Sequence, residues 1–376
     1  MRAPAPVTER GRADGSLSRP AGEPGGRREL SPPPFVSVIV PCRDEERYIG
    51  PCLDSILVTD YPPSRFEVIV ADGMSRDRTR EIVAAHAVRH NAIRLIDNPL
   101  QTTPAALNAG LAAARGDVIM RMDAHVVYPT AYMPRLVAAL LESGADNVGG
   151  VIATLPADQT PLARAIAVAL SHPFGVGNSY FRIGVNQPRW VDNVAFGCWR
   201  RETFARVGVF DEEMVRNQDD EFNHRVIRAG GRILLIPDVV SRYFARRTLR
   251  QVGRMYYQYG YFKPLVAKKV GRVMTVRQLV PALFLASLAV TAVAGAWLAA
   301  GRLAFLAIAG SYLLAVTAVA VGTARRHGVS CGLAATLVFP TVHAAYGLGF
   351  FRGIWDHVLS PRRRRSVHAP AVPLSR

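Results

Sequence analysis

Charged and polar residues that could do chemistry follow three of the short apolar runs in the first third of the chain. Asp72 follows the second run, and Asp123 with His125 ends the fourth, VIMRMDAH. Three more residues follow the first run: Arg43, Asp44 and Glu45. A site built from carboxylates binds phosphate groups only through a cation, and a carboxylate beside an imidazole is a donor pair that divalent metals accept. The pattern predicts a divalent metal, Mn²⁺ or Mg²⁺, held by Asp123 and His125, although either residue alone is more typical of a surface turn.

A parallel sheet would bring these residues to one edge. Apolar runs rich in β-formers alternate with helical patterns, the runs at 36–40, 66–71, 93–96 and 118–122 and the helices at 46–57, 77–89 and 104–115. Such alternation predicts an α/β fold with helices on both faces of the sheet and ligand sites at the carboxyl ends of the strands. The sequence has no G-x-G-x-x-G after its first strand and no P-loop, which excludes those two nucleotide-binding motifs.

Composition narrows the class of partner. The 376 residues carry a net charge of +17, which suits nucleic acid, an acidic membrane surface or phosphorylated small molecules. Residues 1–34 are rich in Pro, Gly, Arg and Ser without an apolar segment, which predicts a disordered basic tail and excludes a secretory signal. The four cysteines are scattered and are expected to be reduced thiols, not a zinc site.

The C-terminal third predicts a membrane domain. Segments 279–300, 303–324 and 329–351 are nearly uncharged and each is long enough to cross about 30 Å of hydrocarbon. Basic residues are denser before the first segment and after the second than between them, which places the first 275 residues on the cytoplasmic side of a multi-pass protein of the cell membrane. The third segment contains Pro340, His343 and several glycines, so an irregular course and either two or three helices stay open. Residues 352–376 form a second basic tail.

Residues 246–278, just before the first apolar segment, mix basic and aromatic side chains. This mixture predicts a helix at the membrane surface that contacts membrane lipids, with its aromatic rings among the headgroups. The same composition occurs in nucleic-acid-binding proteins, but the position next to a membrane segment favours lipid, and no nucleic-acid partner is expected.

Five segments in this order resemble family 2 glycosyltransferases of the GT-A fold: VSVIVPCRDEERYIGPCLDSI, EVIVADGMSRDRT, LNAGLAAARGDVIMRMDAH, GCWRRETFARVGVFDE and NQDDEFNHRVIRAGGRI. The subgroup they resemble is the succinoglycan-type glucosyltransferases of bacterial exopolysaccharide assembly. The resemblance is strong over 36–269 and looser over the apolar C-terminus. It implies a cytoplasmic catalytic domain over 35–245, with a Rossmann-like mixed sheet that binds a nucleotide sugar.

The resemblance also implies roles for the rim residues. Asp72 matches the first aspartate of the family's D-D-G-S stretch, which accepts a hydrogen bond from uracil, while Gly73 replaces the second. Pro41 and the segment 43–45 match the loop that lies over the nucleoside. Asp123 and His125 match the D-x-D motif that contacts the ribose and ligates the metal, with histidine in the second position.

The catalytic base of the family is the aspartate of an E-D-x-E-like stretch that opens a helix, and the match here is Gln218-Asp219-Asp220-Glu221. In an inverting displacement a carboxylate takes the proton of the acceptor hydroxyl while the metal offsets the charge on the departing UDP. Asp219 is the first choice for this role and Asp220 is the alternative. An acidic cluster that merely favours a helix N-terminus explains the two carboxylates but not the ordered set of segments.

Two weaker matches concern the acceptor. Gly197 and Cys198 correspond to a small-residue loop beside the acceptor, although a glycine there is also typical of a tight turn. Gln251 and Arg254 match part of the Q-x-x-R-W element of processive synthases. Met255 stands in place of the tryptophan, which favours the addition of a single sugar over polymer extrusion.

The resulting hypothesis is a membrane-anchored, metal-dependent, inverting glycosyltransferase. It would move a hexose, with glucose as the first expectation, from a UDP-sugar to a lipid-linked acceptor of the undecaprenyl type in cell-surface polysaccharide or glycolipid synthesis. His125 as a metal ligand predicts a preference for Mn²⁺ and a loss of activity below about pH 6.5. The alternatives are a polyprenyl-phosphate sugar transferase and a catalytically inactive membrane scaffold with the same fold.

Overall fold

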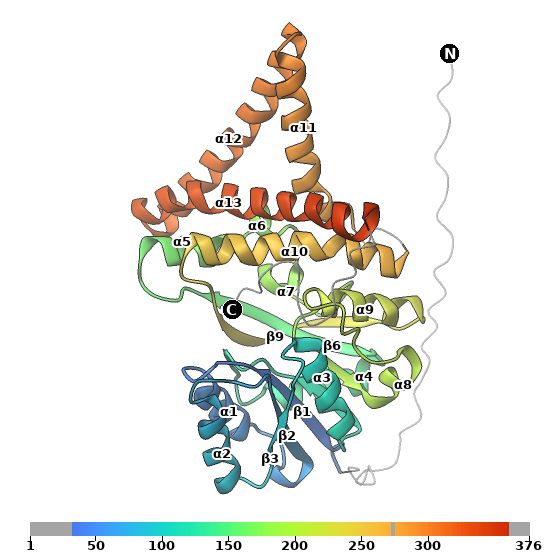
Figure 1. Cartoon of the computed structure of the whole chain (residues 1–376). Helices are drawn as coiled ribbons and strands as arrows, with labels where there is room; N and C mark the ends of the chain where they lie inside the picture. The colour runs from blue at the N-terminus through green and yellow to red at the C-terminus, as the bar shows by residue number, and fades with distance from the viewer. Residues whose placement is uncertain (1–31, 272–274, 361–376) are drawn as a thin grey trace, which may run out of the picture. The chain divides into compact units, whose positions relative to one another are not determined.

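The computed structural model describes residues 32–271 and 275–360, so most of the two predicted tails lies outside the described residues. Among those residues nine strands form one sheet, in the order β3-β2-β1-β4-β8-β6-β9-β5 with β7 paired to β9 (Figure 1). The strands are β1 Val36–Cys42, β2 Phe66–Asp72, β3 Ile93–Asp97, β4 Val118–Arg121, β5 Val126–Val127, β6 Asn147–Leu155, β7 Arg189–Val191, β8 Cys198–Arg200 and β9 Ile233–Phe244.

The four strands predicted from the sequence are confirmed and form the parallel half of the sheet. β1 lies between β2 and β4, with Val38 opposite Val68 on one side and Met120 on the other. The second half is mixed, because β8 runs antiparallel to both β4 and β6 whereas β9 runs parallel to β6. The carboxyl ends of β1, β2 and β4 therefore meet at one edge, as expected from the alternation of strands and helices.

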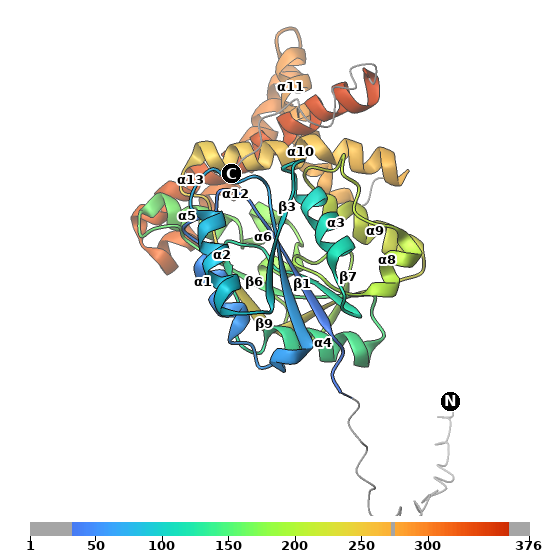
Figure 2. The same ribbon diagram turned by 60° about the horizontal axis from the view of Figure 1, so that its bottom comes forward.

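Helices cover both faces of this sheet (Figure 2). The helices are α1 Ile49–Leu57, α2 Thr79–Arg89, α3 Thr103–Ala113, α4 Tyr132–Ser143, α5 Pro161–Ala169, α6 Pro173–Val176, α7 Tyr180–Ile183, α8 Arg201–Val207, α9 Gln218–Arg228, α10 Leu249–Val270, α11 Val280–Gly295, α12 Ala299–His327 and α13 Val329–Ile354, with short turns η1 Pro63–Arg65, η2 Val276–Gln278 and η3 Trp355–Leu359. Alternate side chains of β1 enter different cores: Val38 packs with α1 and α4, and Ile39 packs with α3, α8 and α9. Both faces are covered, which explains why the parallel strands are predominantly apolar.

The helix α10 lies between the sheet domain and α13 (Figure 1). Glycines let the two backbones touch: a Cβ on Gly260 would lie 2.0 Å from the carbonyl oxygen of Tyr346, and one on Gly349 would lie 2.0 Å from that of Tyr257. The prediction that the aromatic rings of this segment lie among lipid headgroups is wrong for several of them. Tyr261 and Phe262 are buried, because α10 packs against protein on both sides.

The three apolar segments are all helical. By length and composition two of them, α12 and the stretch Val329–Leu359 that contains α13, could cross a membrane, whereas α11 is shorter. The irregular course that the sequence left open for the third segment is not observed, since α13 is continuous through Pro340. Its glycines allow close contact with neighbouring helices, Gly349 and Gly353 with α10, Gly347 with α11 and Gly332 with α12. The helices α11 and α12 extend away from α10 and α13 as a hairpin (Figure 1).

Candidate active site

A cavity of about 950 Å³ begins at the carboxyl ends of β1, β2 and β4 and continues to the C-terminal helices. Its rim contains most of the residues predicted from the sequence, namely Pro41, Arg43, Glu45, Asp123, His125, Asp219 and Asp220. Its other end is formed by side chains of α11, α12 and α13, namely Val280, Pro281, Phe284, Tyr312, Val342, His343 and Tyr346. The volume is within the range of ligand-binding pockets of about 300–1,000 Å³.

Arg121, at the end of β4, joins two of the predicted site residues. Its Nε and Nη2 donate to the two oxygens of Asp123 at 2.7 and 3.0 Å, and its Nη1 donates to the two oxygens of Asp219 at 2.5 and 2.7 Å. The side chain is buried, and the two carboxylates hold its pKa above the usual value in spite of that burial. Arg121 thereby holds Asp123, the predicted nucleotide contact, in a fixed position relative to Asp219, the predicted base.

The two candidate bases have different surroundings. Burial raises the pKa of the Asp219 carboxyl above its usual range; Arg121 opposes this rise and Asp123 adds to it. The Asp220 carboxylate accepts hydrogen bonds from Asn193 and from the ammonium of Lys263. Both aspartates lie in the first turn of α9, where the helix dipole stabilises negative charge. A raised pKa suits a general base near neutral pH, which favours Asp219.

Asp72 is placed differently from its predicted role. Its side chain is fully buried and does not line the cavity. Its oxygens accept hydrogen bonds from Arg80 Nη1 at 2.7 Å and from the backbone and hydroxyl of Ser75. In this arrangement Asp72 holds the turn at Ser75, and a contact with a uracil ring requires the pair with Arg80 to open.

The loop after β1 is fastened to the same turn. The backbone N–H of Asp44 donates to the Ser75 hydroxyl at 2.8 Å, and that of Glu45 donates to the Thr79 hydroxyl at 2.7 Å. Asp44 has a φ of 53°, a left-handed conformation that aspartate tolerates better than most residues. Arg43 and Glu45 consequently line the cavity, whereas Asp44 accepts from the backbone N–H of Arg76.

The side chains that could ligate a metal do not form a complete set of ligands. The Nδ1 of His125 lies 3.1 Å from Oε1 of Glu45, and Asp123 is occupied by Arg121. In the described part of the chain no group of three His, Cys, Asp or Glu side chains could hold an ion. Magnesium-type sites that handle phosphates use one or two protein ligands and complete their shell with phosphate oxygens and water. Asp123 and His125 as the ligands of such a partial site stay a prediction, because Arg121 binds both oxygens of Asp123 here.

The four predicted acceptor residues do not line the cavity. Cys198 is buried within β8, and a Cβ on Gly197 would lie 2.2 Å from the indole of Trp199, so this glycine serves packing. Gln251 closes a capping box with Thr248 at the start of α10. Arg254 is exposed on the same helix. Their roles therefore stay predictions, without support from their positions.

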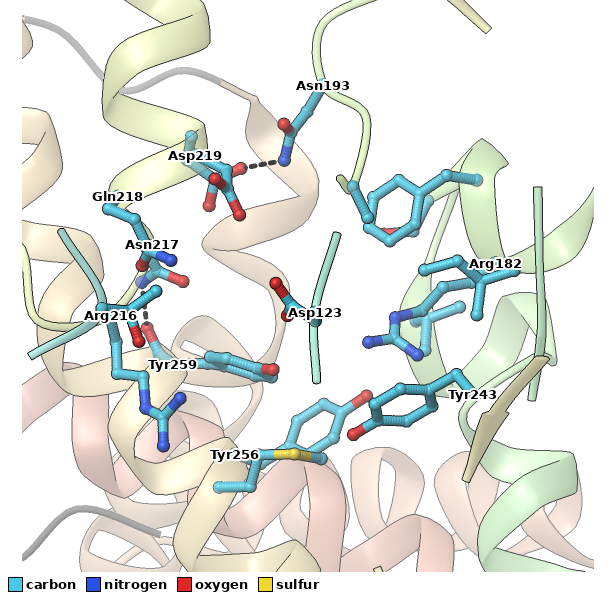
Figure 3. Close-up of a pocket in the computed structure, with 18 of the residues that line it drawn as sticks. Asp123, Arg182, Asn193, Arg216, Asn217, Gln218, Asp219, Tyr243, Tyr256 and Tyr259 are labelled. Carbon is cyan, nitrogen blue, oxygen red and sulfur yellow. Dashed lines mark hydrogen bonds between the residues drawn. The ribbon is translucent and has the colours of Figure 1, made fainter. Parts of the chain in front are cut away.

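The sequence analysis did not single out three arginines of the cavity, Arg182, Arg216 and Arg246. Figure 3 shows Arg182 and Arg216 on opposite sides of Asp123, with the rings of Tyr243, Tyr256 and Tyr259 nearby. They come from α7, the loop before α9 and the link between β9 and α10. No local motif marks these positions. The sequence did mark Arg121, because a charged residue inside an otherwise apolar strand requires a buried partner.

The fold and the rim of charged residues define a nucleotide-sugar transferase of the GT-A type. Residues 37–211 match the family described as Glycosyl transferase family 2. The chain is 30% identical over 322 residues to the succinoglycan biosynthesis protein ExoA of Rhizobium meliloti (strain 1021), covering 85% of this chain and 94% of the relative. The protein belongs to family 2 of the glycosyltransferases and is an enzyme of that class, as the sequence predicted.

A second relative and a solved structure agree with this assignment. A dolichyl N-acetyl-alpha-D-glucosaminyl phosphate 3-beta-D-2,3-diacetamido-2,3-dideoxy-beta-D-glucuronosyltransferase of Methanococcus voltae is 26% identical over 243 residues, covering 62% of this chain and 74% of the relative. The mannosyltransferase of Pyrobaculum calidifontis, solved with GDP-Man and Mn²⁺, is 21% identical, with a TM-score of 0.52 over 86% of this chain and 88% of the other. The structural likeness confirms the GT-A fold.

Proposed function

We propose that the protein is a membrane-anchored, inverting glycosyltransferase that moves a hexose from a UDP-sugar to a lipid-linked acceptor in the synthesis of a cell-surface polysaccharide or glycolipid. One observation carries the proposal: a single cavity connects the strand ends that carry Asp123 and His125 to side chains of α11, α12 and α13. A water-soluble donor and a lipid-linked acceptor could therefore meet inside one site. The names of the two relatives, one in succinoglycan biosynthesis and one acting on a dolichyl-linked sugar, agree with such an acceptor.

The chemistry follows from the residues at the rim. The Asp219 carboxylate takes the proton of the acceptor hydroxyl as the new glycosidic bond forms and the bond to UDP breaks. Arg121 keeps this carboxylate in place through two hydrogen bonds to its oxygens. A divalent ion held by Asp123, His125 and the diphosphate would offset the negative charge on the departing UDP. Arg43, Glu45 and Pro41 bind and orient the nucleoside part of the donor.

The membrane anchoring rests on the C-terminal helices. The hairpin of α11 and α12 presents exposed apolar side chains such as Leu283, Leu306 and Leu314, which water does not favour. Arg325 and Arg326 lie in the last turn of α12, whereas Arg302 alone lies near the turn of the hairpin. This asymmetry supports two crossings, one by α12 and one by the apolar segment 279–298 that contains the shorter α11, with α13 lying along α10 on the cytoplasmic side with the catalytic domain.

The test uses membranes that contain the full chain and radiolabelled UDP-hexoses. Transfer should yield a lipid-extractable product. The number of phosphates in that product distinguishes a lengthened diphosphate-linked glycan from a single sugar on a lipid monophosphate. Asp219→Asn is expected to lower kcat by about 10²–10⁴-fold, the usual contribution of a general base. Asp220→Asn is the matched control on the same helical turn, and its kcat is expected to fall less than that of Asp219→Asn.

The pH dependence provides a second readout. Asp219 must be ionised to act as a base, and its pKa is raised, so kcat should fall as the pH drops through a value above the usual carboxylate pKa of about 3.9. A fully active Asp219→Asn enzyme would remove Asp219 from this role. Absence of UDP release with every UDP-hexose tried would contradict the proposed donor class.

A further inference from the structure

Two arginines of the cavity carry buried donor atoms that have no hydrogen-bond acceptor among the described residues. These atoms are Nη1 of Arg182 and Nε of Arg246. The neighbours of Arg182 are aromatic rings, with its guanidinium 5.6 Å from the ring centre of Phe181 and 5.4 Å from that of Tyr243. More than about 90% of buried donors have a partner in folded proteins. Two such atoms in one cavity indicate a place for a ligand rich in acceptors.

Positive charge converges at this part of the cavity. Arg182, Arg216 and Arg246 all line the cavity, and all three lower the pKa of the Tyr243 hydroxyl, which burial raises. Figure 3 shows Arg182 and Arg216 on either side of Asp123. Both oxygens of Asp123 are already bound by Arg121. Guanidinium forks bind phosphate oxygens in pairs, so a phosphate or diphosphate suits this cluster.

The wall beyond the arginines is apolar and comes from four helices. The ring of Phe284 lies 4.5 Å from that of Tyr312, and the ring of Phe174 lies 6.0 Å from that of Tyr312, measured between centres. Its polar atoms are paired with one another: the Tyr312 hydroxyl lies 2.9 Å from Nδ1 of His343, and Nε2 of His343 lies 2.8 Å from the carbonyl oxygen of Phe174. The surface left for a ligand is therefore hydrocarbon, next to a cationic cluster.

We propose that Arg182 and Arg246 bind the phosphate or diphosphate of a lipid whose chain lies against the wall of Phe284 and Tyr312. This inference rests on the proposed function and deepens it, because it gives the lipid-linked acceptor a phosphate site of its own. The nucleoside of the donor is bound separately, at the strand ends around Pro41 and Arg43. The acceptor lipid enters from the side of α11 and α12, and its sugar extends toward Asp219.

The experiment measures binding to the purified full chain in detergent, with farnesyl diphosphate, inorganic diphosphate and UDP as separate probes. Arg182→Gln and Arg246→Gln are each expected to weaken farnesyl diphosphate binding by about tenfold or more, since each removes a charge-assisted hydrogen bond. Binding of UDP should be unchanged, which also shows that the variants are folded. Arg247→Gln is the matched control, because this neighbouring arginine points outward and pairs with Asp158.

The apolar wall is tested separately. Phe284→Ala should weaken farnesyl diphosphate binding and leave inorganic diphosphate binding unchanged, which distinguishes a lipid ligand from a free diphosphate. Equal losses for UDP and farnesyl diphosphate in the arginine variants would assign the cluster to the donor and overturn the inference. Failure of the wild type to bind farnesyl diphosphate would overturn it too. Either result is distinct from a failure of the proposed function, in which the wild type releases no UDP from any UDP-hexose.

Discussion

Replacing Arg121 by methionine is expected to destabilise the protein by about 3–5 kcal/mol at pH 8, because the change leaves two carboxylates in the site without their cation. The Arg121 side chain is 5% exposed and donates to both oxygens of Asp123 and of Asp219. Methionine keeps much of the volume, so the main loss is electrostatic. In a chain of 376 residues the change corresponds to a fall in Tm of roughly 4–6 °C.

The stability lost in Arg121→Met should increase as the pH rises. Burial already raises the pKa of Asp219, and Arg121 opposes that rise, so its removal raises the folded-state pKa further. A carboxylate whose folded pKa exceeds its unfolded value binds more protons in the folded state and destabilises that state as the pH rises. The penalty of Arg121→Met is therefore full at pH 8 and smaller near pH 5.

Thermal unfolding of the detergent-purified protein, followed by tryptophan fluorescence at the two pH values, measures this effect. Arg135→Met is the matched control, because Arg135 pairs with Asp238 on the surface and such pairs contribute about 0–1 kcal/mol. Adding Asp219→Asn to Arg121→Met should recover part of the lost stability, since it removes one unpaired charge. A loss below about 1 kcal/mol, or an equal loss at both pH values, would refute the reasoning about the buried bridge.

Two further predictions concern the metal and the membrane. His125→Asp should shift the metal preference from Mn²⁺ toward Mg²⁺, because Mg²⁺ prefers a carboxylate to an imidazole, and rates measured with each metal would show the shift; an unchanged preference would leave Asp123 and the diphosphate as the ligands. Trp297→Cys, at the turn between α11 and α12, should react with an impermeant maleimide added outside intact cells. The native cysteines, all buried, give little background, and labelling only after permeabilisation would contradict two crossings.

Much of the parallel half of the fold could be predicted from the sequence. Three of its strands, β1, β2 and β4, are buried on both faces, so each appears as a largely apolar run, and β1 and β4 begin at the residues expected, Val36 and Val118. The charged residues after these runs were correctly assigned to one edge, because parallel strands end there together. Prediction of Asp123, His125 and Asp219 as neighbours of one cavity follows from this topology and from the family resemblance.

The rest depended on contacts that local patterns do not contain. Arg121 meets Asp219 across 98 positions of the chain, and no periodicity encodes that pairing. Asp72 was expected to face a ligand, but whether a carboxylate at a strand end turns outward or binds Arg80 is decided by the neighbouring helix α2. The aromatic residues of α10 were ambiguous for a related reason, since a helical stripe of rings packs equally well on lipid or on protein.

The backbone contact between α10 and α13 determines how the chain can be divided. A chain that ended before α11 would keep the whole sheet and Asp219, but it would lose the cavity wall at Val342 and Tyr346. It would also expose the strip of α10 around Gly260, where the backbone of α13 now replaces water. The C-terminal helices are therefore part of the body that forms the cavity, and the proposed membrane anchor cannot be removed without opening that cavity.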